Sequence, residues 1–79
     1  MRYLVVIERT DGNYSAYSPD LPGCIATGKN PRQARQNMEE AILFHLQGLM
    51  EDGLPIPESK ALANYIFVPK KSLSDLSGR

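Results

Sequence analysis

Residues 18–24 read SPDLPGC, a run that contains two prolines, a glycine, an aspartate and the single cysteine of the chain. In its last four residues, proline stands second and glycine third, which is the pattern of a type II turn. The first proline keeps the residue before it extended, and the aspartate can accept a backbone N–H two residues further on. The run therefore predicts a rigid structural turn made of Pro19, Asp20, Leu21, Pro22, Gly23 and Cys24.

Short extended segments lie on both sides of this turn. Arg2–Arg9 is rich in β-branched and aromatic residues, and Tyr14–Ser18 is a second extended run. Asp11-Gly12 between them gives a hairpin signal. Ile25–Gly28 follows the turn as a short third strand.

A long helix is predicted over residues 31–52. Asn30 is its N-cap, Pro31 takes the first helical position, and Gln33 completes a variant of the capping box. Gly53 is a natural residue to end it in the left-handed conformation. The helix carries one broad stripe of mostly apolar residues at helical spacing: Ala34, Met38, Ala41, Ile42, His45, Leu46 and Leu49.

The remaining chain predicts one more strand and a tail. Tyr65–Val68 has the composition of a fourth strand, and residues 69–79 are rich in lysine and serine. The predicted fold is α+β, with an antiparallel sheet of three to four strands and one long helix packed on one face. The element order is β-β-β-α-β. Residues 1–68 form the domain, and residues 69–79 form a flexible C-terminal tail.

Apolar residues that this fold leaves uncovered predict a protein interface. Both faces of the first strand are apolar, so we expect this strand to be central, but one helix can cover only one face. Two helix residues also fall outside the apolar stripe, and uncovered apolar surface of this kind favours a partner. The candidate interface residues are Leu4, Val6, Tyr17, Leu43 and Phe44. A chain of 79 residues is marginal as a monomer, so we expect a homodimer or a dimer of dimers.

The composition excludes several classes of function. Nine basic residues balance nine acidic ones, so no overall charge favours nucleic acid or an anionic membrane. One cysteine rules out an internal disulfide. Only Cys24 and His45 offer soft metal ligands, too few for a typical zinc site. We therefore expect no metal and no cofactor. The short apolar run at the N-terminus is neither a signal peptide nor a membrane span, which predicts a cytoplasmic protein.

The motifs together resemble the HicB-like antitoxin family. The resemblance rests on the YSAY run at residues 14–17, the PDLPGC run at 19–24, a short strand ending at Gly28, a helix from about residue 31, and Pro55-Ile56-Pro57. It covers about residues 3–68. It implies a partial ribonuclease-H-like fold and no enzymatic activity. It also implies a HicA-like, mRNA-cleaving toxin as the partner, which the antitoxin covers at its active site.

Two departures from the family qualify this expectation. The last eleven residues are too few for the helix-turn-helix or ribbon-helix-helix segment of many members, so we expect no direct nucleic-acid binding by this chain alone. Residues 29–33 also lack the acidic helix start common in the family. An orphan structural or adaptor domain without a toxin is the alternative function.

Two enzymatic alternatives have weaker support. Cys24 would need a base such as His45 beside it to act as a nucleophile, and a small buried cysteine at the end of a turn is the simpler interpretation. A two-metal nuclease would need a carboxylate midway along the first strand, where residues 4–6 are all apolar. Glu39 and Glu40 on the helix have no predicted partners. We expect no catalytic residues.

Overall fold

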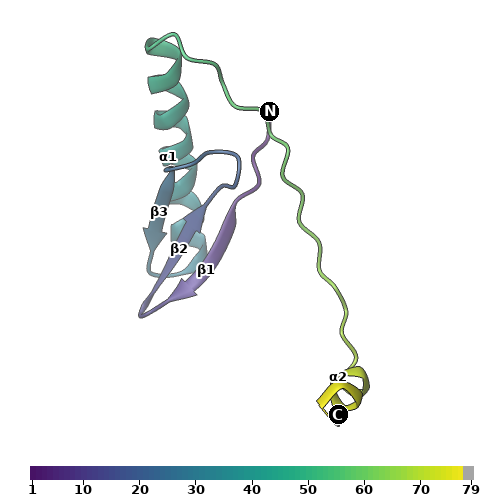
Figure 1. Ribbon diagram of the computed structural model, residues 1–79. Helices are drawn as coiled ribbons and strands as arrows, with labels where there is room; N and C mark the ends of the chain where they lie inside the picture. Colours follow the sequence, from purple (N-terminus) through teal and green to yellow (C-terminus); the bar gives the residue numbers. More distant parts are fainter. Residues whose placement is uncertain (78–79) are drawn as a thin grey trace.

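The computed structural model describes residues 1–77. Three strands precede a long helix, and a short second helix lies near the C-terminus (Figure 1). The bounds are β1 Val6–Thr10, β2 Asn13–Tyr17, β3 Ile25–Gly28, α1 Pro31–Glu51 and α2 Lys70–Ser77. The fold is α+β, with three antiparallel strands and one long helix packed on one face of their sheet.

The sheet is a meander in the order β1-β2-β3. Val6 lies opposite Tyr17 at one end of the first pair, and Thr10 lies opposite Asn13 beside a two-residue loop. β1 begins at Val6, later than the predicted Arg2, because β2 offers no partner beyond Tyr17. The chain turns there, and the N–H of Leu21 donates to the carbonyl of Ser18 at 3.1 Å.

The corner, residues 18–24, ends in a type II turn at residues 21–24. The N–H of Cys24 donates to the carbonyl of Leu21 at 3.1 Å, and Gly23 has a φ of +82°. Leu21 and Cys24 are both buried, with 1% and 6% of their surfaces exposed. The first and last residues of the turn therefore both pack into the core. The hydroxyl of Ser18 is buried and has no hydrogen-bond partner among the described residues.

The prediction that Asp20 accepts a hydrogen bond from the backbone two residues further on is wrong. Two residues further on stands Pro22, which has no N–H to donate. Instead, Oδ2 of Asp20 accepts hydrogen bonds from the backbone N–H groups of Lys60 and Ala61, each at 2.9 Å. The aspartate therefore fixes a distant segment of the chain to the corner.

Both ends of α1 are capped by local hydrogen bonds. The side chain of Asn30 accepts from the N–H of Gln33 at 2.8 Å, and the Gln33 side chain accepts from the N–H of Lys29 at 2.7 Å. At the other end, Gly53 has a φ of +69°. Leu54 N–H donates to the carbonyl of Leu49 at 2.9 Å, and Gly53 N–H donates to that of Met50 at 3.1 Å. These two bonds form a Schellman motif.

The core lies between α1 and the inner face of the sheet. Its buried residues are Ala16, Leu21, Cys24, Ala34 and Met38. Half-buried apolar side chains of the N-terminal segment, the three strands and the helix stripe pack around them: Tyr3, Val5, Ile7, Tyr14, Ala26, Ala41, Ile42 and Leu46. This core is small, and among the residues whose burial is described only two large side chains, Leu21 and Met38, are completely buried.

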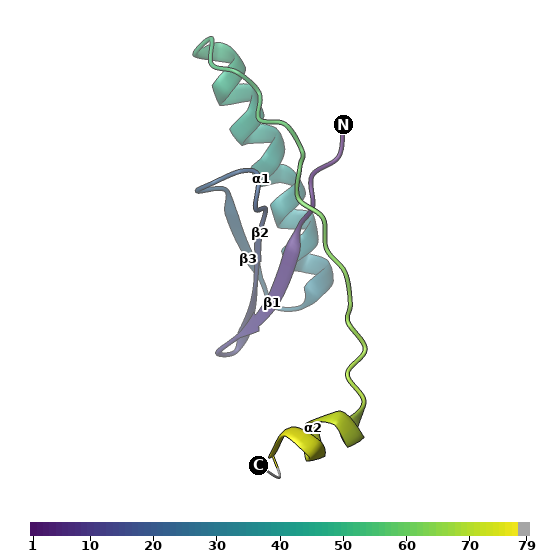
Figure 2. The ribbon, with the colours of Figure 1, turned by 45° about the vertical axis from the view of Figure 1, so that its right-hand side comes forward.

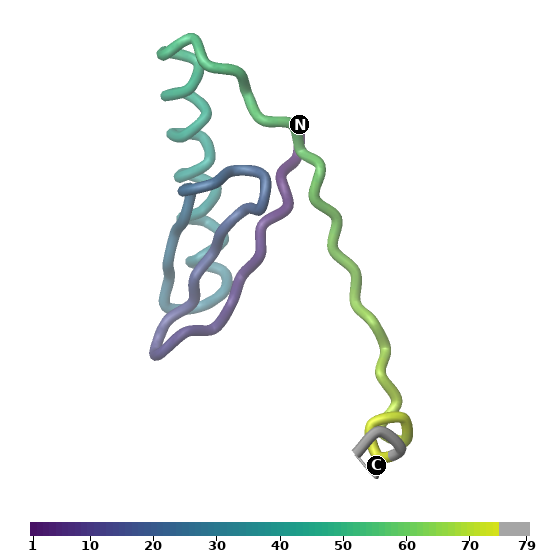
Figure 3. Tube along the Cα trace, viewed as in Figure 1, coloured from purple at the N-terminus to yellow at the C-terminus, as the bar shows by residue number. Residues whose placement is uncertain are grey.

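The C-terminal part of the chain differs from the prediction. Residues 65–68 pair with no strand among the described residues, so the predicted fourth strand is wrong, and β1 is an edge strand rather than a central one. The chain beyond residue 61 leaves the body as an extended arm (Figures 2 and 3). The radius of gyration is 17.1 Å, whereas a compact chain of this length has about 12 Å.

The predicted flexible tail contains a helix. α2 occupies Lys70–Ser77, and residues 78–79 lie outside the described residues. The carbonyl of Pro69 accepts hydrogen bonds from the N–H groups of Ser72 and Leu73 at 3.0 and 3.4 Å. The helix therefore begins directly after Pro69, and the lysine- and serine-rich composition did not indicate it.

Candidate protein-binding surface

The outer face of the sheet, opposite α1, carries one apolar row. Val6, Tyr17 and Ile25 lie side by side on the three strands, because Tyr17 is the register partner of both others. We call these three residues the outer row. Tyr17 is 37% exposed and Ile25 is 62% exposed. The predicted residues Val6 and Tyr17 thus share one face. Ile25 was missed, although extending the antiparallel pairing from β2 to β3 would have revealed it.

The next row on the same face is polar. Glu8, Ser15 and Thr27 lie opposite one another across the three strands. Leu4, another candidate interface residue, precedes β1 and is half-buried. The apolar part of the outer face is therefore confined to the end of the sheet near the corner.

Helix α1 extends beyond the sheet at that same end. Its 21 residues span about 31 Å, whereas strands of five residues span about 17 Å. Beneath the overhang lies an open groove of about 410 Å³, which we call the helix groove. It is lined by Gly23, Cys24, Ile25, Ala41, Phe44, His45, Gly48, Leu49 and Asp52. Ile25 belongs to both this groove and the outer row, so the two apolar surfaces are continuous.

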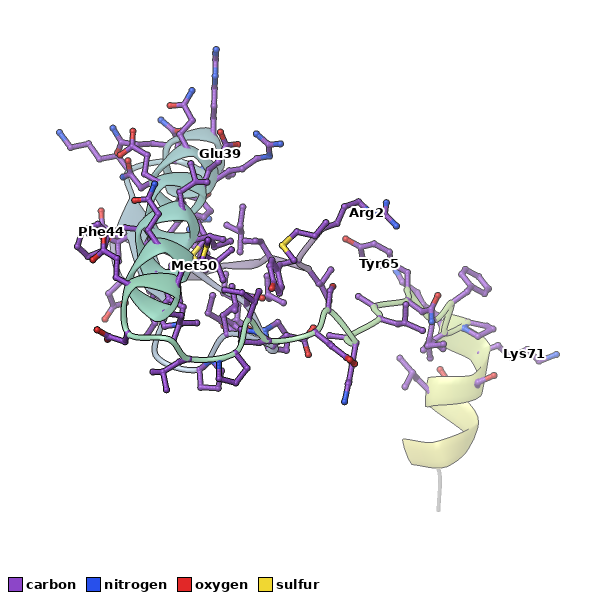
Figure 4. All side chains as sticks on the ribbon, turned by 90° about the horizontal axis from the view of Figure 1, so that it is seen from above. Arg2, Glu39, Phe44, Met50, Tyr65 and Lys71 are labelled. Atoms are coloured by element: carbon purple, nitrogen blue, oxygen red, sulfur yellow. The ribbon has the colours of Figure 1, made fainter. Side chains whose placement is uncertain are left out.

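The structure separates the predicted pair Leu43 and Phe44. Phe44 lines the helix groove and is 80% exposed, and Figure 4 shows it projecting from α1 on the side away from Tyr65. Leu43 is 58% exposed and lines a different groove, next to Val5 and Ile42. Successive helical residues are about 100° apart around the helix axis, so the two side chains lie on opposite sides of the helix stripe.

Cys24 and His45 both line the helix groove, but the cysteine is unsuited to nucleophilic attack. Burial raises the pKa of the Cys24 thiol above its ordinary value of 9.0. The thiol is therefore protonated near neutral pH, and the thiolate is the reactive form. This arrangement gives Cys24 a packing role.

We expect Cys24 to react slowly with iodoacetamide at neutral pH, because it is both protonated and 6% exposed. The rate should rise at least about tenfold in denaturing urea. A matched control is Leu62→Cys in a Cys24→Ala background, since position 62 is 91% exposed. Labelling followed by mass spectrometry measures both rates. Equal rates for Cys24 and the exposed control in the folded protein would contradict the packing role.

The carboxylates offer no assembled site in the described part of the chain. Glu39 and Glu40 are both exposed on α1. Among the described residues, no group of three or more histidine, cysteine, aspartate or glutamate residues is placed to hold a metal ion. A search of the same residues finds no helix that is long and apolar enough to span a membrane.

The fold and the surface define a small α+β domain whose most distinctive exposed feature is apolar rather than chemically reactive. Residues 3–72 match the family model described as "HicB_like antitoxin of bacterial toxin-antitoxin system". The chain therefore belongs to the HicB-like antitoxin family.

Curated relatives come from phage, archaea and bacteria. An uncharacterized 14.9 kDa protein of Haemophilus phage HP1 is 37% identical over 70 residues, which cover 89% of this chain and 53% of that protein. The chain thus spans about half the length of this relative. A UPF0150 protein of Thermoplasma acidophilum is 37% identical over 62 residues, covering 77% of this chain and 90% of the relative.

A solved structure supports the same relationship. A chain in a structure titled "HicA3 and HicB3 toxin-antitoxin complex" matches with a TM-score of 0.65 and 33% sequence identity. The match covers 75% of this chain and 70% of that one.

Proposed function

We propose that this chain is an antitoxin that binds a HicA-like, mRNA-cleaving toxin and blocks its active site sterically. The observation that carries the proposal is membership of the antitoxin family over residues 3–72. The likeness to a chain from a toxin-antitoxin complex supports a toxin as the partner.

The apolar surface offers a place for this partner. A stable interface buries about 800 Å² of solvent-accessible surface on each protein, and its centre is enriched in aromatic residues that act as anchors. The outer row and the rim of the helix groove supply two such anchors, Tyr17 and Phe44, with Ile25 between them. We assign toxin binding to this continuous surface.

The proposed action is binding rather than catalysis. A protonated Cys24 and exposed, unassembled carboxylates favour a non-enzymatic role. We place the protein in the cytoplasm, where a toxin would meet mRNA, and we propose that it self-associates as a homodimer or a larger assembly. Direct binding to nucleic acid is not part of the proposal, because the chain is neutral overall.

Phe44→Glu is expected to weaken neutralisation without unfolding the chain. The side chain is 80% exposed, so a carboxylate there is tolerated in the free protein but must be desolvated in the complex. Loss of a central anchor costs about 2 kcal/mol or more, which is roughly thirtyfold in affinity. The measurement is rescue of growth when the chain is co-expressed with the product of an adjacent small gene, where the genome has one.

Gln36→Glu is the control, because it adds the same charge at an exposed position in the first half of α1. It should rescue growth like the unaltered chain. Equal rescue by Phe44→Glu would place the toxin elsewhere on the surface. A neighbouring gene product that is harmless, or that does not co-purify with the chain, would favour the orphan adaptor domain instead.

A further inference from the structure

The extended arm, residues 62–69, exposes apolar side chains and pairs with no strand among the described residues. Tyr65 is 105% exposed, Ile66 81%, Phe67 87% and Val68 53%. Figure 1 shows the arm running away from the sheet, and Figure 4 shows Tyr65 far to one side of α1. The backbone is already extended, as strand pairing requires, and exposed apolar surface of this kind marks an interaction site.

The root of the arm is fixed to the body of the domain. Asp20 holds the N–H groups of Lys60 and Ala61, and the hydroxyl of Tyr3 donates to the carbonyl of Pro57. Residues 59–63 line a groove together with residues 2–4. These contacts set where the arm leaves the domain, so its departure is a built feature of the fold.

The sheet has a free edge that matches such an arm. β1 pairs only with β2 among the described residues, which leaves its outer backbone groups open. The opposite edge is partly used, because the side-chain amide of Asn37 donates to the carbonyl of Thr27 in β3 at 2.7 Å. A strand added to this sheet therefore has its best site beside β1.

A groove of about 700 Å³ lies between α1 and the N-terminal segment that leads into β1, and we call it the edge groove. Tyr3 and Val5 line it from that segment and Ile42 and Leu43 line it from α1, together with the charged residues Arg2, Arg35 and Glu39. A strand beside β1 would place alternate side chains into this groove and the others next to Val6 on the outer face. All four residues of 65–68 are apolar, as burial on both sides requires.

We propose that the arm of one copy adds to the outer edge of β1 in a second copy, and that the second arm adds reciprocally to the first. A twofold dimer built in this way uses both arms and both edges and leaves neither open. A second copy is favoured over closure onto the same chain, because the fixed root directs the arm away from its own sheet. The proposal rests on the proposed self-association but not on toxin binding.

Disulfide trapping between differently tagged chains tests the exchange. One full-length chain carries Ile66→Cys or Phe67→Cys, the other carries Glu8→Cys on the exposed side of β1, and both carry Cys24→Ala. The two chains are unfolded together and refolded under mild oxidation. For one of the two arm positions, more than about half of the mixed dimers should become covalently linked. Gln47→Cys, at an exposed position on α1, should trap at least about tenfold less.

Sedimentation of the unlinked full-length chain separates the remaining outcomes. A dimer that Phe67→Glu converts to a folded monomer, with Asn64→Glu remaining dimeric, supports exchange. A dimer with no arm-to-edge trapping overturns the exchange while leaving self-association intact. A folded monomer at micromolar concentration, with trapping only inside one chain that carries both cysteines, overturns both. None of these results depends on whether a toxin binds.

Discussion

Gly28→Ala is expected to destabilise the domain by about 3 kcal/mol or more. A Cβ at this position would lie 2.3 Å from the backbone nitrogen of Ala34 and 2.8 Å from its Cα. Both atoms belong to the first turns of α1, so no side chain can move aside to relieve the contact. β3 and α1 would have to separate, and the core between them would open. Urea unfolding at fixed protein concentration, followed by circular dichroism, measures the loss.

Gly48→Ala is the matched control for this substitution. A Cβ at Gly48 meets nothing within 4 Å, and the residue lies inside α1. Alanine is the better helix former by about 1 kcal/mol, so this variant should be more stable than the unaltered chain. Opposite signs for the two glycines support the observed packing of β3 against α1. A neutral Gly28→Ala would mean that the strand and the helix lie further apart.

Leu21→Ala is expected to cost about 2–5 kcal/mol, the second large effect. Leu21 is 1% exposed and is one of the two large side chains that are completely buried. The type II turn directs it into the core, so truncation leaves a cavity that the rigid turn cannot collapse to fill. In a domain of this size the loss approaches the whole stability.

Met50→Ala provides the comparison for the leucine. Met50 lies on α1 and is 68% exposed, so its truncation should change the free energy of unfolding by less than about 0.5 kcal/mol. Both variants are compared by thermal and urea unfolding at one protein concentration. Similar effects for the two would contradict the assignment of Leu21 to the core.

Features set by neighbouring residues could be predicted from the sequence. The turn at residues 21–24, the Asn30 cap and the end of α1 at Gly53 each depend on the chemistry of a few consecutive residues. The α+β class follows from the order of these elements. The exposed position of Phe44 also follows, because helical periodicity alone places it off the apolar stripe.

Features set by distant contacts could not be predicted in the same way. Nothing near Asp20 indicates that it binds Lys60 and Ala61, forty residues away. The composition of residues 65–68 predicted a fourth strand, but composition does not show whether a partner edge is present, and these residues pair with no strand among the described residues. The same limit applies to β1, which has two apolar faces and yet lies at the edge of its own sheet.

The most direct test of the antitoxin account is inhibition of the purified toxin. A HicA-like toxin, taken from a small gene next to this one where such a gene exists, is assayed for RNA cleavage while this chain is added in increasing amounts. The account predicts that cleavage falls to background near equimolar amounts, and that Phe44→Glu needs roughly thirtyfold more protein. Full cleavage in the presence of excess folded chain would contradict the central claim.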